Sequence, residues 1–154
     1  MRSIKNLVFD YSVKFGSKLA KGLFVGDYIV NSTLENCYIK VTLELVNGAK
    51  NAKVIGGLDG TVKFTNCVFE INDVNQEDDY RLLLSNNASK ATFTNCAYIT
   101  TDTGEIFDTG TISGTLTRYD SVSAFASANT TWATPWEITT TSIKLKGKAV
   151  QTIS

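Results

Sequence analysis

A six-residue motif recurs four times along the first two-thirds of this 154-residue chain. It occurs as LENCYI from Leu34, as FTNCVF from Phe64 and as FTNCAY from Phe93. A fourth version, IKNLVF, begins at Ile4 and carries Leu7 in place of the cysteine. Successive copies start 30, 30 and 29 residues apart. A period of this length is typical of solenoids, in which each repeat is one unit that buries its inner face only by stacking on its neighbours.

Each copy of the motif predicts a strand with a corner in it. After the asparagine, alternate residues such as Leu7, Phe9 and Tyr11 are apolar, which is the period of a strand with one buried face. Before the asparagine the phase shifts by one residue, and asparagine tolerates the left-handed conformation that bends a strand. The predicted corner residues, one in each repeat, are Asn6, Asn36, Asn66 and Asn95.

Stacking places equivalent residues of the four repeats in columns. A second apolar run lies about 20 residues into each repeat, the first of them at 23–25, so each coil of about 29 residues should hold two or three short strands. The expected hydrophobic column is Phe9, Ile39, Phe69 and Tyr98. The asparagine side chains should form an amide ladder. The outward column Asp10, Lys40 and Glu70 alternates in sign, which favours stacking at the spacing of neighbouring strands.

The N-C-x-[FYI] strand with its asparagine corner resembles the right-handed parallel β-helix of the pectate-lyase-like group. That group includes polysaccharide lyases and many bacteriophage tailspikes and virion surface proteins. The resemblance covers Ile4 to about Thr103. It implies an all-β protein, a short right-handed parallel β-helix of about four coils over residues 1–108. Residues 109–154 lose the repeat, and we expect them to form short strands that cap the open end of the stack.

Three cysteines share one inward column. Cys37, Cys67 and Cys96 could form a metal site, a redox pair or a nucleophile, or they could serve as small buried apolar residues. The last of these is favoured because Leu7 fills the same position in the first coil and the chain contains no histidine. Parallel side-chain directions also suit a disulfide poorly. We therefore expect three reduced, buried thiols.

Acidic residues gather at one edge of the third and fourth coils. Asp73 and Asp102 are one repeat apart and should be neighbours in the stack, where carboxylates could bind Ca²⁺, an ion that lyases of the resembling group often use. The spacing matches no calcium-loop motif, and a solvated loop is the alternative. These two residues are weak metal candidates, and we expect no metal and no cofactor.

Catalytic residues are not expected on the outer face. Glycosidases need two suitably spaced carboxylates, and lyases of the resembling group need a strong base facing the substrate. Here the outward column of Asp10, Lys40 and Glu70 balances its own charge. The chain is also much shorter than the enzymes of that group. The sequence therefore predicts a protein that is not an enzyme.

A second outward column is apolar where a solvated strand would be polar. Its members are Val8, Tyr38, Val68 and Ala97. Either a loop of the same chain or another subunit should cover them. Tailspike-like β-helices commonly associate as trimers, so the resemblance implies a homotrimer with these residues at the contact. Trp132 and Trp136 in the tail would cap the stack, contact a subunit or partner, or stack on sugars.

Charge and hydropathy limit the remaining functions. The 15 basic and 15 acidic residues balance, which argues against a nucleic-acid partner, and no apolar run predicts a membrane span or an export signal. The resemblance then favours a non-enzymatic structural virion protein of a tailed phage, a capsid decoration protein or short fibre, assembled in the host cytoplasm as an oligomer on a larger protein shell. The alternative is a carbohydrate-binding or polysaccharide-cleaving module whose partner is a surface glycan. A bacterial adhesion repeat is a third possibility.

Overall fold

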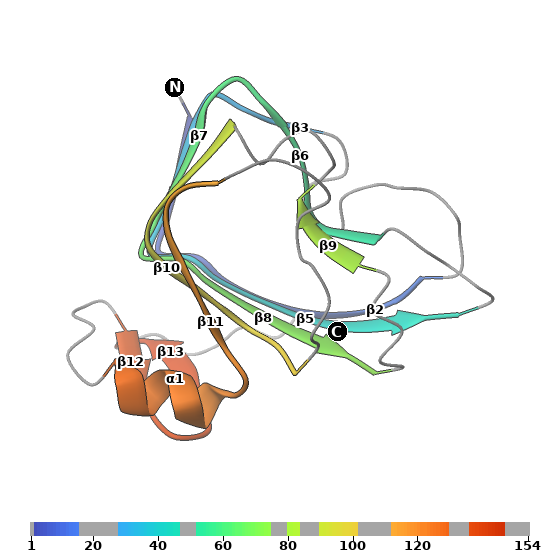
Figure 1. The fold of residues 1–154 in the computed structure, drawn as a ribbon, viewed down its shortest axis with the longest axis vertical. Coiled ribbons are helices and arrows are strands. Elements are labelled where there is room, and N and C mark those ends of the chain that lie inside the picture. Colours follow the sequence, from blue (N-terminus) through green and yellow to red (C-terminus); the bar gives the residue numbers. More distant parts are fainter. Residues whose placement is uncertain are drawn as a thin grey trace.

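The structure is a computed structural model, and it describes residues 2–15, 28–46, 52–74, 80–83, 90–101, 112–129 and 136–146. Its architecture is a short parallel β-helix, all-β except for one short helix (Figure 1). Strands from successive coils lie directly on one another, as the sequence repeat predicts.

The largest sheet bends at the asparagine corner. Before the corner it contains β1 (Arg2–Lys5), β4 (Ser32–Glu35), β7 (Val62–Thr65) and the first half of β10 (Ala91–Ile99). After the corner it contains β2 (Val8–Phe15), β5 (Tyr38–Leu45), β8 (Val68–Asp73) and the second half of β10. The strand order is β1-β4-β7-β10-β8-β5-β2, with parallel pairing between coils.

The predicted register is confirmed. Phe9 pairs with Ile39, Ile39 with Phe69, and Phe69 with Tyr98. Every corner asparagine has a positive φ, between 51° and 55°. From the second coil on, the amide Nδ2 donates to the asparagine Oδ1 of the preceding coil: Asn36 to Asn6 at 3.1 Å, Asn66 to Asn36 at 3.2 Å and Asn95 to Asn66 at 2.9 Å. The amide ladder therefore runs through all four coils.

A smaller parallel sheet closes another side of the coil. It contains β3 (Tyr28–Val30), β6 (Ala52–Asp59) and β9 (Tyr80–Leu83). The apolar run predicted at 23–25 lies outside the described residues. After β3 and β6 the chain turns again, through Asn31 with φ 39° and Gly60 with φ 67°. A Cβ on Gly60 would lie 1.9 Å from the Asn31 Oδ1 atom, so only glycine fits beneath this second corner.

The core lies between these sheets. Phe64 and Phe93, which occupy the first motif position, stack with ring centroids 4.9 Å apart and planes 11° from parallel. Phe69 packs edge-on against both rings. All three are completely or almost completely buried. The inward columns thus form a continuous apolar core through the middle coils.

The C-terminal segment departs from the repeat. β11 (Ser113–Tyr119) pairs in parallel with β10, so Leu116 lies beside Cys96 only 20 residues further along the chain. Strands β12 (Trp136–Ile138) and β13 (Ile143–Leu145) form an antiparallel pair. The expectation of strands throughout the tail is wrong for α1 (Val122–Ala128), a helix whose N-cap Ser121 side chain accepts the Ala124 N–H at 3.0 Å. Among the described residues, no helix has the length and hydropathy to span a membrane.

Candidate functional site

The apolar outer column is covered by the chain itself. Tyr38, Val68 and Ala97 are 5 %, 0 % and 2 % exposed. They belong to a second apolar cluster, separate from the main core, together with residues of α1 and the β12–β13 hairpin: Phe125, Trp136 and Ile143. Figure 1 shows these elements against the outside of the sheet near β10 and β11.

Trp136 lies at the centre of this cover. Its ring meets Tyr38 edge-on, with centroids 6.2 Å apart and planes at 84°, and it is 2 % exposed. The sequence left open whether this column is covered by the same chain or by another subunit. In the structure a segment of the same chain covers it. The wet apolar surface on which the trimer contact was predicted is absent at Tyr38, Val68 and Ala97, and Val8 is half-buried. Trp132 lies outside the described residues.

The charged outer column forms the ion pair that its alternating sign predicts. The Lys40 Nζ lies 3.2 Å from the Glu70 Oε1, and the Tyr38 hydroxyl donates to the other carboxylate oxygen of Glu70. Burial, followed by the negative charge of Glu70, raises the pKa of Tyr38. The hydroxyl thus stays protonated and acts as a fixed donor that holds the Glu70 carboxylate in place.

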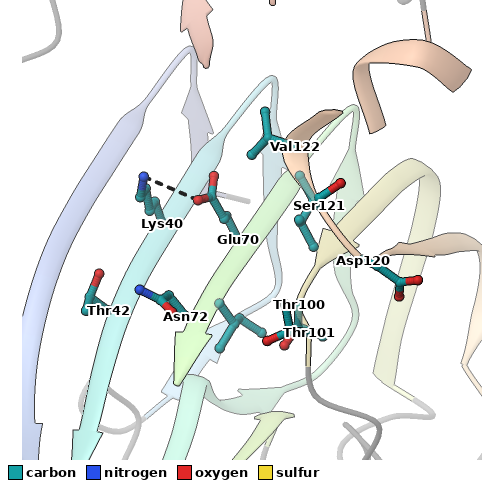
Figure 2. A pocket seen from close by; sticks show the side chains of 11 residues that line it. Lys40, Thr42, Glu70, Asn72, Thr100, Thr101, Asp120, Ser121 and Val122 are labelled. Atoms are coloured by element: carbon teal, nitrogen blue, oxygen red, sulfur yellow. Dashed lines mark ion pairs between the residues drawn. The ribbon is translucent and has the colours of Figure 1, made fainter. Parts of the chain in front are cut away.

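A pocket of about 330 Å³ with a mixed polar and apolar lining opens beside this ion pair (Figure 2). It lies between the outer face of β5 and β8 and the segment that leads into α1. The described polar side chains that line it are Lys40, Thr42, Glu70, Asn72, Thr100, Thr101, Asp120 and Ser121. Asp120 is itself paired with Arg118 at 2.8 Å. The pocket offers hydroxyl, amide and paired charged groups, which suit a small ligand rich in hydroxyl groups.

The three cysteines are free and buried, as predicted. Each Sγ lies 3.4–3.7 Å from the carbonyl oxygen of the first motif residue of the preceding coil, as for Cys67 and Leu34. Contacts with the thiols of Cys37 and Cys96, together with burial, raise the pKa of Cys67. The column therefore behaves as small apolar residues with weak thiol donors.

Of the two acidic candidates, Asp73 and Asp102, the structure describes only Asp73. Asp73 is buried, 5 % exposed, in the last position of β8. Asp102, its predicted neighbour, lies outside the described residues. Within the ranges that the structure covers, no three histidine, cysteine, aspartate or glutamate side chains are grouped so that they could hold a metal.

The first coil forms one edge of the stack, and no described strand pairs with its outer side. All four residues of β1 are exposed, and Ile4 is 36 % exposed whereas Leu34 in the next coil is fully buried. The Tyr11 hydroxyl is buried without a hydrogen-bond partner among the described residues. The sequence signal for this edge is that Ile4 begins a complete copy of the motif, so the first coil has the same corner and inward apolar positions as the coils stacked on it.

Comparison with family models, curated proteins and solved structures found no match to this chain. The assignment of a function therefore depends on the geometry of the chain and on the resemblance of its motif.

Proposed function

We propose that this chain is a non-enzymatic structural protein of a tailed-phage virion, a capsid decoration protein or short fibre that docks onto a larger protein assembly. The observation that carries the proposal is the first coil, which has the corner asparagine and inward apolar residues of an internal coil, whereas no described strand pairs with its outer edge. An exposed strand edge of this kind is a template for pairing with another chain. A place in a virion is supported by the resemblance of the motif to phage surface β-helices.

The rest of the molecule supports a structural role. The inward columns are filled by apolar side chains, and the asparagine amides bond continuously from coil to coil. Exposed ion pairs also connect neighbouring coils, as between Lys5 and Glu35 at 2.6 Å. Such a stack resists deformation because every coil is bonded to its neighbours along its whole length.

Self-association as a trimer remains part of the proposal, supported by the resemblance alone. Its contact would have to use surfaces other than Tyr38, Val68 and Ala97, because α1 and the β12–β13 hairpin already cover these residues. Assembly in the host cytoplasm suits three reduced thiols.

The proposal is tested on particles of the phage that encodes the chain. Mass spectrometry of gradient-purified virions should find it at a fixed number of copies per particle, and immunogold labelling should place it on the capsid or the tail. Particles from a phage with the gene deleted are the control for both measurements. Recovery of the chain only in the soluble lysate, with no trace in purified particles, would refute a structural virion role.

A second candidate function, binding of a surface glycan, is favoured by the polar pocket beside Lys40 and Glu70. Thr42 and Asn72 line it with groups that can bond to sugar hydroxyls. A glycan array probed with the full chain would test this candidate. Binding that Asn72→Leu weakens at least tenfold, but that Asn129→Leu at the C-cap of α1, outside the pocket lining, leaves unchanged, would support it.

A further inference from the structure

The open edge of the first coil exposes main-chain groups in a regular pattern. The N–H groups of Tyr38, Val68 and Ala97 each donate to a carbonyl of the preceding coil, at 2.8, 2.9 and 3.0 Å. Val8 is the equivalent residue of the first coil, so its N–H points away from the stack. The same alternation along β2 turns the N–H groups of Asp10 and Ser12 outward. No strand in the described part of the chain lies beyond β1 and β2 at this end.

The amide ladder ends on this edge at Asn6, whose Nδ2 has no ladder partner among the described residues. Three of the four corner asparagines donate their Nδ2 to the preceding coil, and Asn6 only accepts, from Asn36. The repeat geometry points the Asn6 Nδ2 to the side where a preceding coil would lie. The Asn6 Oδ1 thus accepts from the second coil, whereas the Nδ2 faces the side on which no described strand lies.

The opposite end of the stack is finished differently. In β10 two residues separate Phe93 from Cys96. In β11 only Thr115 separates their partners, Gly114 and Leu116. The preceding Gly114 has φ 92°, and a Cβ there would lie 1.8 Å from the Phe93 carbonyl oxygen. The asparagine ladder therefore stops at β11.

This difference makes a second copy, stacked head to tail, a poor partner for the edge of the first coil. In a head-to-tail arrangement β11 of the second copy would face β1 and β2. Its register with β10 would then bring Arg118 to the apolar column of Phe9. It would also bring no asparagine to Asn6. The open edge fits a different strand.

We propose that β1 and β2 bind a strand–corner–strand segment of a partner protein, which runs parallel to them and continues the solenoid. The segment would place an asparagine in the left-handed conformation beside Asn6 and apolar residues inward. Its outward charges should complement Lys5, Asp10 and Lys14. The inference rests on the proposed docking function and names the chemistry of the partner.

The second coil shows what such a segment looks like. Glu35 pairs with Lys5 at 2.6 Å, and Glu44 pairs with Lys14 at 2.7 Å. Lys40 is in register with Asp10. A segment with this sequence pattern would place a glutamate, a lysine and a glutamate beside the outward charges of the first coil, as the second coil does. A peptide of residues 31–45 is therefore a suitable probe, with Cys37→Leu to match the residue at that position in the first coil.

The experiment measures the fluorescence anisotropy of this labelled peptide with the full chain. We expect saturable binding in the micromolar range, and none with a scrambled peptide of the same composition. Ser12→Pro removes one outward N–H and no bond to the second coil, so it should weaken binding at least tenfold, whereas Ser12→Ala should not. Asn6→Asp keeps the acceptor for Asn36 but loses the open donor, and it should weaken binding by a similar factor.

Several outcomes would overturn the inference. One is no binding to the wild-type chain at peptide concentrations up to about 1 mM, a free energy of only about 4 kcal/mol. Equal binding to Ser12→Pro, with its unfolding midpoint unchanged, would also refute it. Concentration-dependent dimerisation that Ser12→Pro abolishes would show that a second copy is the occupant instead. Since particle incorporation is measured separately, failure of the peptide to bind would leave the proposed function itself standing.

Discussion

The asparagine ladder can be tested most directly at Asn66, in the middle of the stack. Its side chain donates to Asn36 and accepts from Asn95, and its φ is 51°. Asn66→Gly removes two hydrogen bonds, each worth about 0.5–1.5 kcal/mol net, and keeps the freedom to adopt this φ. Asn66→Ala removes the same bonds and adds about 1–2 kcal/mol for a left-handed non-glycine residue. The expected losses are about 1–3 kcal/mol for glycine and about 2–5 kcal/mol for alanine.

Asn6 provides a matched control, because it occupies the same corner and makes only one ladder bond. Asn6→Gly should therefore cost about 1 kcal/mol less than Asn66→Gly. The measurement is equilibrium urea unfolding followed by far-ultraviolet circular dichroism, with the slope on denaturant checked for each variant so that partial unfolding is recognised.

Two results would refute this reasoning. If Asn66→Ala lay within about 0.5 kcal/mol of the wild type, neither the ladder nor the left-handed corner would contribute to stability. If Asn66→Gly were less stable than Asn66→Ala, the corner would not require a positive φ in solution. Either result would require a different explanation for the asparagine in each repeat.

Three further predictions follow from the buried groups. Cys37, Cys67 and Cys96 should not react with a thiol reagent in the native protein, and all three should react after denaturation without reductant; a disulfide or bound metal would contradict their packing role. Trp136→Ala should lower the free energy of unfolding by about 3 kcal/mol and leave the mass measured by light scattering unchanged; loss of an oligomer without loss of stability would instead indicate a subunit contact. Because the pKa of Tyr38 is raised in the fold, the folded state keeps a proton that the unfolded chain releases above about pH 10, so stability should fall there by up to about 1.4 kcal/mol per pH unit. Tyr38→Phe should reduce that slope, and an unchanged slope would show that this hydroxyl titrates normally.

The repeat was enough to predict the stacked strands and their register. Period-two apolar residues around an asparagine determine both the face of each strand and the position of the corner, so Phe9, Ile39 and Phe69 could be aligned from the sequence. The ion pair between Lys40 and Glu70 followed from the same alignment. These are contacts between equivalent positions, which a repeat specifies directly.

The features that the sequence did not predict are those that break the repeat. β11 stacks on β10 with an offset of about 20 residues instead of 29, so the spacing gave no signal for it. The second corner is formed by Asn31 in one coil and by Gly60 in the next, both with positive φ. Because the two residues differ, the sequence shows no repeated residue type at this corner. The α1 helix is only seven residues long and is stabilised by its Ser121 cap and by packing of Phe125, which a weak local propensity does not reveal.

The covered outer column changes where a partner can bind. The sequence alone shows that Tyr38 and Val68 are apolar and face outward. It cannot show whether a distant segment of the chain or another molecule covers them, because either would bury the two side chains equally well. The structure places Phe125 and Trp136 on them, and thereby removes the side of the stack as an apolar contact surface there. At the far end β11 has a glycine in place of the corner asparagine. The first coil is the described surface that combines outward main-chain donors, the Asn6 amide and a partly exposed apolar residue. Main-chain pairing at such an edge depends on strand direction and corner geometry more than on apolar area, so a small partner segment can be selected by its asparagine and its charge pattern.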